Sequence, residues 1–288
     1  MFSRQLAEDA ARIETQFDLV MDGLDDLPVT RAMRYACEGG KRLRGFLVLE
    51  SARMLGVDPA RAIWAATGIE ALHAYSLVHD DLPCMDDDDL RRGRPTVHKA
   101  WDEGTAVLAG DALQALAFEL AGHPDCGDAQ VRADLTLSLA RASGARGMVL
   151  GQALDIAAET SETPLTLDQI TRLQAGKTGA LIEWSACAGA RLAGADIAPL
   201  SRYARALGLA FQIADDILDE EGDAEKAGKR LRKDAEAGKA TFVSLLGLDG
   251  AKARAAELAD QAEAALAPYG AGAQCLRQAA RFVISRDS

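Results

Sequence analysis

The chain has 288 residues, of which 49% are hydrophobic and 5% aromatic, and it carries a formal net charge of −12. This apolar fraction can bury a sizeable core, so intrinsic disorder is excluded. An acidic chain is a poor candidate for nucleic-acid binding, and without a run of about 18 apolar residues no membrane span is expected. The N-terminus is amphipathic and acidic, so no signal peptide is expected. The five cysteines form no CxxC pair, which predicts free thiols in the cytoplasm.

The apolar residues recur with helical spacing nearly throughout. Asp58-Pro59 predicts a helix over 59–82, because an N-cap residue precedes proline at the first helical position. Thr166 to Gln169 has the form of a capping box that opens another helix. Residues 86–96 are expected to form a loop, and no alternating strand pattern is present. We therefore expect an all-α fold with one domain over 1–288, with further helices at 104–121, 130–143, 196–220 and 250–267.

Two aspartate clusters are the most specific feature of the sequence. They are Asp80-Asp81-Leu-Pro-Cys-Met-Asp86 and Asp215-Asp216-Ile-Leu-Asp219. Asp215 and Asp219 have i, i+4 spacing, so their carboxylates share one face of a helix. Carboxylates that emerge together from an apolar helix repel one another unless a cation joins them. Mg²⁺ fits, because it is usually held by one or two carboxylates together with water and substrate phosphates.

The first cluster cannot lie on a regular helix. Asp80 and Asp86 have i, i+6 spacing, which places them about 240° apart. Pro83 disfavours the α conformation at Leu82, so the helix is expected to end or distort near residue 82 and Asp86 to fold back. For residues 86–89 alone, a solvated surface face is the ordinary interpretation.

Basic segments flank the first cluster. Gly39-Gly40-Lys41-Arg42-Leu43-Arg44 precedes it, and Arg91-Arg92-Gly93-Arg94 follows it. Glycines allow close approach of a ligand, and arginine forks match phosphate oxygens. An ion-pair network between residues 91–94 and 86–89 explains the second segment equally well. Further cationic candidates beside glycines are Lys177, Lys229, Lys233 and Lys239.

His73 is expected to face the same site, because i, i+7 spacing brings it within about 20° of Asp80 on a helix. Lys177-Thr178 does not belong to a P-loop, since Thr171 occupies the position of the required glycine and no strand precedes it. Neither GxSxG nor HExxH occurs. An acidic chain can accept a diphosphate only if metals bridge it to carboxylates and local cations complement it. The sequence therefore predicts metal-assisted chemistry on a diphosphate ester, with an apolar helical cavity for the rest of the molecule.

These segments resemble the trans-prenyl diphosphate synthases of the polyprenyl synthetase family, and most of all the bacterial farnesyl diphosphate synthases. The resemblance runs from about residue 30 to the end and implies a bundle of mostly antiparallel helices around a deep central cavity, usually as a homodimer. The stretches that carry it, in family order, are GGKRLR (39–44), HAYSLVHDDLPCMDDDDLRRGRPTVHK (73–99), GDALQALAFE (110–119), GQALD (151–155), KTGAL (177–181), FQIADDILDEEGD (211–223) and GKATF (238–242).

The resemblance implies that isopentenyl diphosphate is joined head to tail to an allylic diphosphate, with three Mg²⁺ ions. The implied metal ligands are Asp80, Asp81, Asp86, Asp215 and Asp219. The residues implied to contact the allylic diphosphate are Arg91, Lys177, Lys229 and Lys239. Those implied to hold isopentenyl diphosphate are Lys41, Arg44, His73 and Arg92. Thr178 and Gln212 would line the site where the allylic cation forms.

In the implied mechanism the metals stabilise the leaving diphosphate, the C–O bond ionises, and the isopentenyl double bond attacks the allylic cation. The cavity must exclude water, which would quench the cation. Two positions depart from the family. Gly45 follows Arg44 where relatives often have proline, and Arg232 stands where they commonly have glycine. The second departure leaves the roles of Lys229 and Lys233 open.

The expected product is the C15 farnesyl diphosphate, made by two condensations. Tyr75 lies about 7.5 Å of helix rise before Asp80, where relatives that stop at C15 commonly have an aromatic residue. An ideal helix places Ser76 closer to the face of Asp80, and a packed core aromatic is the other interpretation of Tyr75. A geranylgeranyl diphosphate synthase with a deeper pocket is therefore an alternative.

Two other classes remain as alternatives. A terpene cyclase also uses two acidic metal motifs, but it has no isopentenyl diphosphate to hold, so GGKRLR and the Arg91-Arg92 pair argue against it. A non-catalytic subunit that regulates an active partner would not need intact aspartate clusters.

Overall fold

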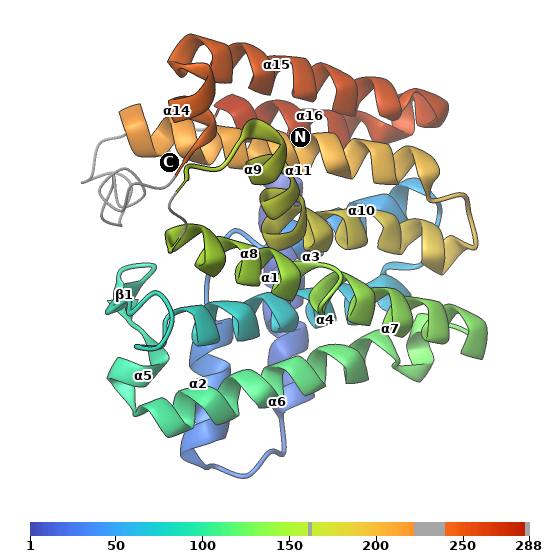
Figure 1. Ribbon diagram of the computed structural model, residues 1–288. Coiled ribbons are helices and arrows are strands. Elements are labelled where there is room, and N and C mark those ends of the chain that lie inside the picture. Colours follow the sequence, from blue (N-terminus) through green and yellow to red (C-terminus); the bar gives the residue numbers. More distant parts are fainter. Residues whose placement is uncertain (161–162, 222–239, 286–288) are drawn as a thin grey trace.

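The computed structural model describes residues 1–160, 163–221 and 240–285, and this part of the chain is almost entirely helical (Figure 1). Its elements are α1 (Phe2–Met21), α2 (Pro28–Cys37), α3 (Leu43–Met54), α4 (Pro59–Asp80), β1 (Leu90–Arg91), β2 (Arg94–Pro95), α5 (Val97–Ala100), α6 (Glu103–Ala121), η1 (Pro124–Cys126), α7 (Ala129–Ser143), α8 (Met148–Glu159), α9 (Leu167–Gln174), η2 (Ala175–Gly179), α10 (Ala180–Ala193), α11 (Ala198–Glu221), α14 (Phe242–Leu246), α15 (Leu248–Ala265), η3 (Ala267–Ala273) and α16 (Gln274–Ser285).

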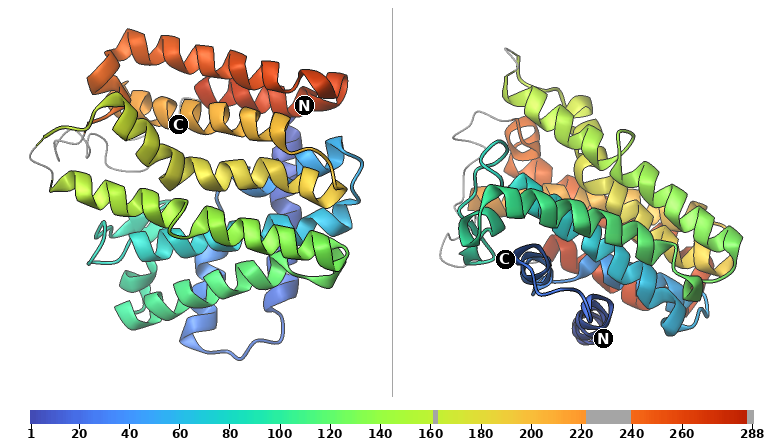
Figure 2. Two further views of the ribbon diagram at one scale, coloured as in Figure 1. Left: turned by 45° about the vertical axis from the view of Figure 1, so that its right-hand side comes forward. Right: turned by 90° about the horizontal axis from the view of Figure 1, so that it is seen from below.

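The longer helices lie side by side, and two helices cross them. Contacts between neighbours run through the molecule in the order α6, α4, α3, α10, α11 and α15. Helices α1 and α2 run across this direction and are seen nearly end-on in the right-hand view of Figure 2. The expected all-α fold is confirmed. Among the described residues, no helix combines the length and apolar character needed to span a bilayer.

Helix α3 connects the two parts of the hydrophobic core. Phe46 and Leu47 pack with buried residues of α10, α11, α15 and α16. Val48 and Leu49 pack with buried residues that lie mainly on α1, α2, α4, α6 and α10. The turn that precedes α3 therefore lies in a rigid setting, because the helix it opens is buried on both sides.

The start and end of α4 follow from its sequence. Asp58 caps the helix, because its carboxylate accepts the amide hydrogen of Ala60 at 2.9 Å, and Pro59 occupies the first turn. The helix ends at Asp80, three residues before Pro83, close to the predicted break. The predicted capping box at the start of α9 is also present, formed by Thr166 and Gln169. The other helices predicted from periodicity are found within a few residues of their expected bounds.

The predicted loop over 86–96 is wrong in one respect, because it contains a short β-hairpin. Leu90 pairs with Pro95 and Arg91 pairs with Arg94. The two residues between the strands, Arg92 and Gly93, have φ of 55° and 73°. Positive φ at both central positions is typical of the tight turn that suits a hairpin. The sequence signal was missed because arginine occupies a position where asparagine or aspartate is usual.

Candidate active site

The two aspartate clusters lie at the same edge of the molecule. The C-terminal ends of α4 and α11 both point toward the side on which the β1–β2 hairpin lies (Figure 1). After α4 the chain turns back as predicted, because the amide of Asp86 donates to the carbonyl of Asp80 at 2.8 Å. The amide of Asp87 donates to the carbonyl of Leu82 at 3.2 Å. The turn therefore brings Asp86 beside Asp80 in spite of their unfavourable helical spacing.

Asp80 lies in an electrostatically unfavourable place. Burial raises the pKa of its carboxyl group from 3.8 to about 6, and the charges of Asp86 and Asp81 add to the rise. Lys177 on η2 is the largest influence that lowers this pKa, so its ammonium lies near Asp80. A group of carboxylates with a raised pKa is a site that a cation would stabilise.

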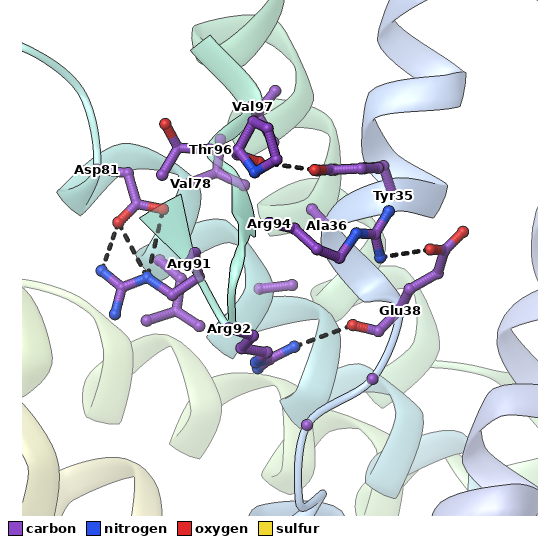
Figure 3. A pocket seen from close by; sticks show the side chains of 15 residues that line it. Tyr35, Ala36, Glu38, Val78, Asp81, Arg91, Arg92, Arg94, Thr96 and Val97 are labelled. Carbon is purple, nitrogen blue, oxygen red and sulfur yellow. Dashed lines mark hydrogen bonds and ion pairs between the residues drawn. The ribbon is translucent and has the colours of Figure 1, made fainter. Parts of the chain in front are cut away.

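Asp81 is bonded to Arg91. It is 3% exposed, and its Oδ1 accepts the Nε–H of Arg91 at 3.0 Å (Figure 3). The same guanidinium lies 3.5 Å from a carboxylate oxygen of Asp88. Burial raises the pKa of Asp81, and Arg91 opposes this rise. The family resemblance implies metal for Asp81 and diphosphate for Arg91, and the structure pairs the two with each other.

Lys177 lies in a short π-helical turn, η2, between α9 and α10. Such turns are rare and often occur at functional sites. Its Nζ lies 2.6 Å from Oδ2 of Asp155 on α8. A side chain at Gly151 would clash with the backbone of Lys177, so this glycine allows α8 to approach η2 closely. Lys177 is thus held between Asp155 and the surroundings of Asp80, with Thr178 next to it in the same turn.

The aspartates of the second cluster make two different kinds of contact. Asp215 and Asp219 are half-buried on α11, and Gln212 lies on the same helix, three residues before Asp215. The negative charge of Asp215 helps to raise the pKa of Arg44 against the effect of burial. Asp216 instead accepts the amide hydrogen of Phe242 at 2.7 Å. Asp216 therefore anchors the first turn of α14.

Four cationic or ring-nitrogen side chains line one small cavity of about 160 Å³. These residues, which the sequence assigned to isopentenyl diphosphate, are Lys41, Arg44, His73 and Arg92. Glu70, Phe211 and Phe282 also line it. The buried Nε of Arg44 has no hydrogen-bond partner in the described part of the chain. A buried donor without a partner is costly, so this cavity would gain from an anion.

The charges in this cavity act on one another. Burial lowers the pKa of Arg44, and Glu70 and Asp215 oppose this effect. The pKa of His73 lies well below 6.5, because of burial and then because of the positive charges of Arg44 and Arg92. His73 is therefore neutral at pH 7 and can donate one N–H without adding charge.

The backbone around GGKRLR is unusual. Gly40 has φ of 87°, and a side chain there would lie 2.8 Å from the guanidinium carbon of Arg92. The absence of a side chain at Gly40 therefore leaves room for this arginine, whereas the sequence analysis expected the glycines to leave room for a ligand. Arg42 has φ of 52°, and its guanidinium is buried 5.4 Å from the ring centre of Phe17.

A second cavity of about 290 Å³ lies behind Asp81, between α2, α4 and the hairpin (Figure 3). Arg94 stacks over Tyr35, with its guanidinium carbon 3.9 Å from the ring centre, and donates to Glu38 at 2.6 Å. Arg92 donates to the backbone carbonyl of Glu38 at 3.1 Å. The expected ion pairing between residues 91–94 and 86–89 is therefore found for Arg91, which lies 3.5 Å from Asp88, whereas Arg94 pairs with Glu38 and Arg92 also reaches the cationic cavity.

Tyr75 points toward α6. It is 9% exposed and lies edge-on to His79 with ring centres 5.2 Å apart, and burial raises the pKa of its hydroxyl while nearby Gln114 lowers it. His79 in turn occupies the space that Gly110 leaves free, since a side chain at Gly110 would clash with the imidazole. Ser76 donates its hydroxyl hydrogen to the carbonyl of His73 at 2.9 Å.

The carboxylates suit a metal that also binds substrate. In the described ranges no group of three or more His, Cys, Asp or Glu side chains could hold a metal ion by itself. Mg²⁺ typically takes only one or two carboxylates and completes its coordination with water and phosphate oxygens. The raised pKa of Asp80 shows that its surroundings would gain from a cation. Lys229, Arg232, Lys233 and Lys239 lie outside the described residues.

Two residues were missed by the sequence analysis. Asp155 lies in the GQALD stretch, but nothing in its spacing shows that it would meet Lys177. Glu70 lies three residues before His73, so both share one face of α4. That spacing was a usable signal for placing Glu70 at the site.

Comparison with known proteins agrees with this geometry. The polyprenyl synthetase family model matches residues 28–270. The farnesyl diphosphate synthase of Haemophilus influenzae is 41% identical, covering 100% of this chain and 99% of that protein. That of Escherichia coli is 44% identical over 90% of each chain. A crystal structure of an FPP/GFPP synthase from Zymomonas mobilis has a TM-score of 0.91 and 47% identity, with 98% of each chain covered.

The chain therefore belongs to the polyprenyl synthetase family and is a prenyltransferase. A geranylgeranyl pyrophosphate synthase of Arabidopsis thaliana is also similar, at 41% identity over 91% of this chain and 75% of that protein. Family membership thus leaves the length of the product to be argued from the site.

Proposed function

We propose that this prenyltransferase condenses isopentenyl diphosphate head to tail with dimethylallyl and then geranyl diphosphate, and releases farnesyl diphosphate and diphosphate. The observation that carries the proposal is the cavity that Lys41, Arg44, His73 and Arg92 line together. One wall of this cavity belongs to the helix that carries the first aspartate cluster, since α4 contains both His73 and Asp80. Two neighbouring sites for anions are what a reaction between two diphosphates requires.

Asp80, Asp81, Asp86, Asp215 and Asp219 are proposed to hold three Mg²⁺ ions together with the allylic diphosphate. Bound Mg²⁺ would neutralise the leaving diphosphate and so lower the cost of breaking the C–O bond. Asp81 would join this set through the lone pairs that Arg91 does not use, chiefly those of Oδ2. We propose that Arg91 then contacts the diphosphate, because its guanidinium already lies between Asp81 and Asp88.

Lys177 is proposed to contact the same diphosphate. Asp155 keeps its ammonium in place through the 2.6 Å ion pair, and charge-assisted bonds of this kind are strong. Thr178 and Gln212, on η2 and α11, would line the site where the allylic cation forms. Lys229 and Lys239 are proposed to add positive charge. Apolar side chains that line the site of the allylic cation would have to exclude water, which would otherwise capture the cation.

On the other side of the reaction, Lys41, Arg44 and Arg92 would bind the diphosphate of isopentenyl diphosphate. Neutral His73 would donate one N–H to a phosphate oxygen, and the unpartnered Nε–H of Arg44 would donate another. These contacts orient the double bond toward the cation. The proton lost from the adjacent carbon would pass to the released diphosphate, so no protein base is required.

The similarity to named farnesyl diphosphate synthases over nearly the whole chain favours a C15 product. A geranylgeranyl diphosphate synthase is the second candidate, and Tyr75 is the feature that argues against it. A terpene cyclase is disfavoured, because it would not need the cationic cavity. A single domain over 1–288, a homodimer, a cytoplasmic location and the number of Mg²⁺ ions stay predictions.

One incubation tests the proposal. The purified chain is mixed with isopentenyl diphosphate, each allylic primer and Mg²⁺, and the products are separated by chromatography after dephosphorylation. We expect farnesol from both dimethylallyl and geranyl diphosphate, and none when Mg²⁺ is replaced by chelator. A cyclic hydrocarbon made from geranyl diphosphate alone, or a C20 product, would overturn the assignment.

A further inference from the structure

Glu70 is a carboxylate in the wall of a cavity that otherwise carries positive charge. It is 2% exposed and lines the same cavity as Lys41, Arg44, His73 and Arg92. A carboxylate there should repel a diphosphate unless its charge is directed elsewhere. None of the roles argued above uses this side chain.

Both oxygens of Glu70 are directed at the segment that carries Lys41 and Arg44. Oε1 accepts the amide hydrogen of Gly45 at 2.8 Å, in the first turn of α3. Oε2 lies 3.8 Å from Nη1 of Arg42, and this arginine is 3% exposed. Amides in the first turn of a helix have no partner within the helix, and negative charge is favourable there. Glu70 therefore satisfies the start of α3.

Arg42 needs such support because its backbone is left-handed, with φ of 52°. A residue with a side chain is rarely found in this region unless its surroundings hold it there. Here the guanidinium donates to the carbonyl of Cys37, lies over the ring of Phe17 and faces Glu70. The left-handed residue lies between Lys41 and Arg44, so it sets how these two side chains enter the cavity.

Gly45 allows Glu70 to approach. A side chain at this position would lie 3.1 Å from Cγ of Glu70 and would also press on Ile13. Gly45 also supplies the N–H that Glu70 accepts, and proline at the same position would have none. The contact therefore depends on both Gly45 and Glu70.

We propose that Glu70 is a positioning residue, which holds Arg42 and Gly45 so that Lys41 and Arg44 are preorganised to bind isopentenyl diphosphate. The inference rests on the proposed function and adds to it a residue that touches neither substrate. Because Oε1 accepts the Gly45 amide hydrogen and Oε2 faces the guanidinium of Arg42, the negative charge of Glu70 is partly offset by the turn. Its charge also favours the protonated forms of Arg44 and Arg92, which burial opposes.

The test compares Glu70→Ala with Glu70→Gln, which keeps an oxygen that can accept the Gly45 amide. We expect Glu70→Ala to raise KM for isopentenyl diphosphate at least about ten-fold, as for a lost bond to a charged group. KM for geranyl diphosphate should change less than about three-fold, and Glu70→Gln should recover part of the loss. Equal changes in both KM values, or no change in either, would overturn the proposal.

Glu70→Ala leaves Arg42 buried beside an empty position and could unfold the chain. Glu70→Gln avoids this problem, because it keeps the size of the side chain and an oxygen for the Gly45 amide while it removes the charge that faces Arg42. We expect its melting temperature to stay close to that of the unaltered chain, and KM for isopentenyl diphosphate to rise without a matching rise in KM for geranyl diphosphate. If KM for isopentenyl diphosphate is unchanged in Glu70→Gln and the rise in Glu70→Ala accompanies unfolding, Glu70 only stabilises the fold and the inference is wrong.

Calorimetric titration with isopentenyl diphosphate alone separates this inference from the proposed function. If the unaltered chain makes no prenyl product, the proposed function fails. If it is active but binds isopentenyl diphosphate with the same affinity after Glu70→Ala, only the role of Glu70 fails.

Discussion

Arg91 and Asp81 form an ion pair beside the active site, with Nε of the arginine 3.0 Å from Oδ1 of the aspartate. The family resemblance implies two different ligands for these residues, a diphosphate and a metal. In the structure the two side chains bond to each other. In the proposed function, binding of the allylic diphosphate and its metals would change this pairing.

The pair should also contribute to stability. Arg91→Gln leaves the buried Asp81 without its main partner, so we expect the free energy of unfolding to fall by about 1–3 kcal/mol, after allowance for the partial exposure of Arg91. Lys99→Gln is the matched control, because Lys99 pairs with Asp89 at 2.9 Å on an exposed surface. It should cost less than about 1 kcal/mol. Urea unfolding without metal measures both, and similar losses would contradict the expectation.

The ionised carboxylate of Asp80 should be required for activity but should lower the stability of the fold. Its pKa is raised from 3.8 to about 6, so the folded chain binds more protons than the unfolded chain between these values. The contribution of protonated Asp80 to the free energy of unfolding is therefore fully present below about pH 4 and is lost as pH rises through about 6. The shift corresponds to roughly 3 kcal/mol as an upper bound. Asp80→Asn should abolish turnover yet raise the melting temperature at pH 7.5 without metal.

The comparison is made at two pH values. The gain in melting temperature of Asp80→Asn should shrink toward zero near pH 4, where the native carboxyl group is already protonated.

Asp215→Asn should also abolish turnover while circular dichroism stays unchanged. Substantial activity of either variant, or of the unaltered chain in chelator, would contradict the role of metal at these residues.

The two diphosphate subsites should be separable by mutation. Lys41→Ala, Arg44→Ala and His73→Ala are expected to raise KM for isopentenyl diphosphate by roughly 10–150-fold, because each removes a bond worth about 1.5–3 kcal/mol to a charged group. KM for geranyl diphosphate should change much less. Steady-state kinetics with one substrate varied at a time measure the split. A parallel rise in both constants would mean that the cavity serves both substrates.

The close approach of α8 to η2 should be required for Lys177 to act. Gly151→Ala places a side chain against the backbone of Lys177, so it should lower both turnover and the melting temperature. Gly272→Ala is the control, since its added carbon would lie 3.7 Å from Cγ of Met54, an ordinary contact. Activity assays and thermal melts compare the two. Normal activity of Gly151→Ala would show that the π-helical turn tolerates displacement.

Local sequence signals predicted the features that depend on neighbouring residues. The end of α4 and the return of Asp86 to Asp80 followed from Pro83. Pairings between separate elements could not be predicted in this way, because they depend on which helices meet. The bond between Lys177 and Asp155 joins η2 to α8, and neither residue carries a local sign of it.

Tyr75 should limit the length of the product. Its ring is buried on α4 five residues before Asp80, and Gln114 and His79 hold it in place. Because the diphosphate is fixed at the aspartates, a tail that grows along α4 should stop at a bulky side chain. Tyr75→Ala should therefore shift the product from C15 toward C20 or longer, as measured by chromatography of the dephosphorylated alcohols.

Two further variants decide between Tyr75 and its neighbour Ser76. Tyr75→Phe loses the hydroxyl but keeps the ring, so it should still give C15 if the bulk of the ring is what stops the chain. Ser76→Phe should shorten the product only if Ser76 faces the tail, as an ideal helix would place it. An unchanged C15 product from Tyr75→Ala together with a shorter product from Ser76→Phe would assign the limit to Ser76 and make Tyr75 a packed core aromatic.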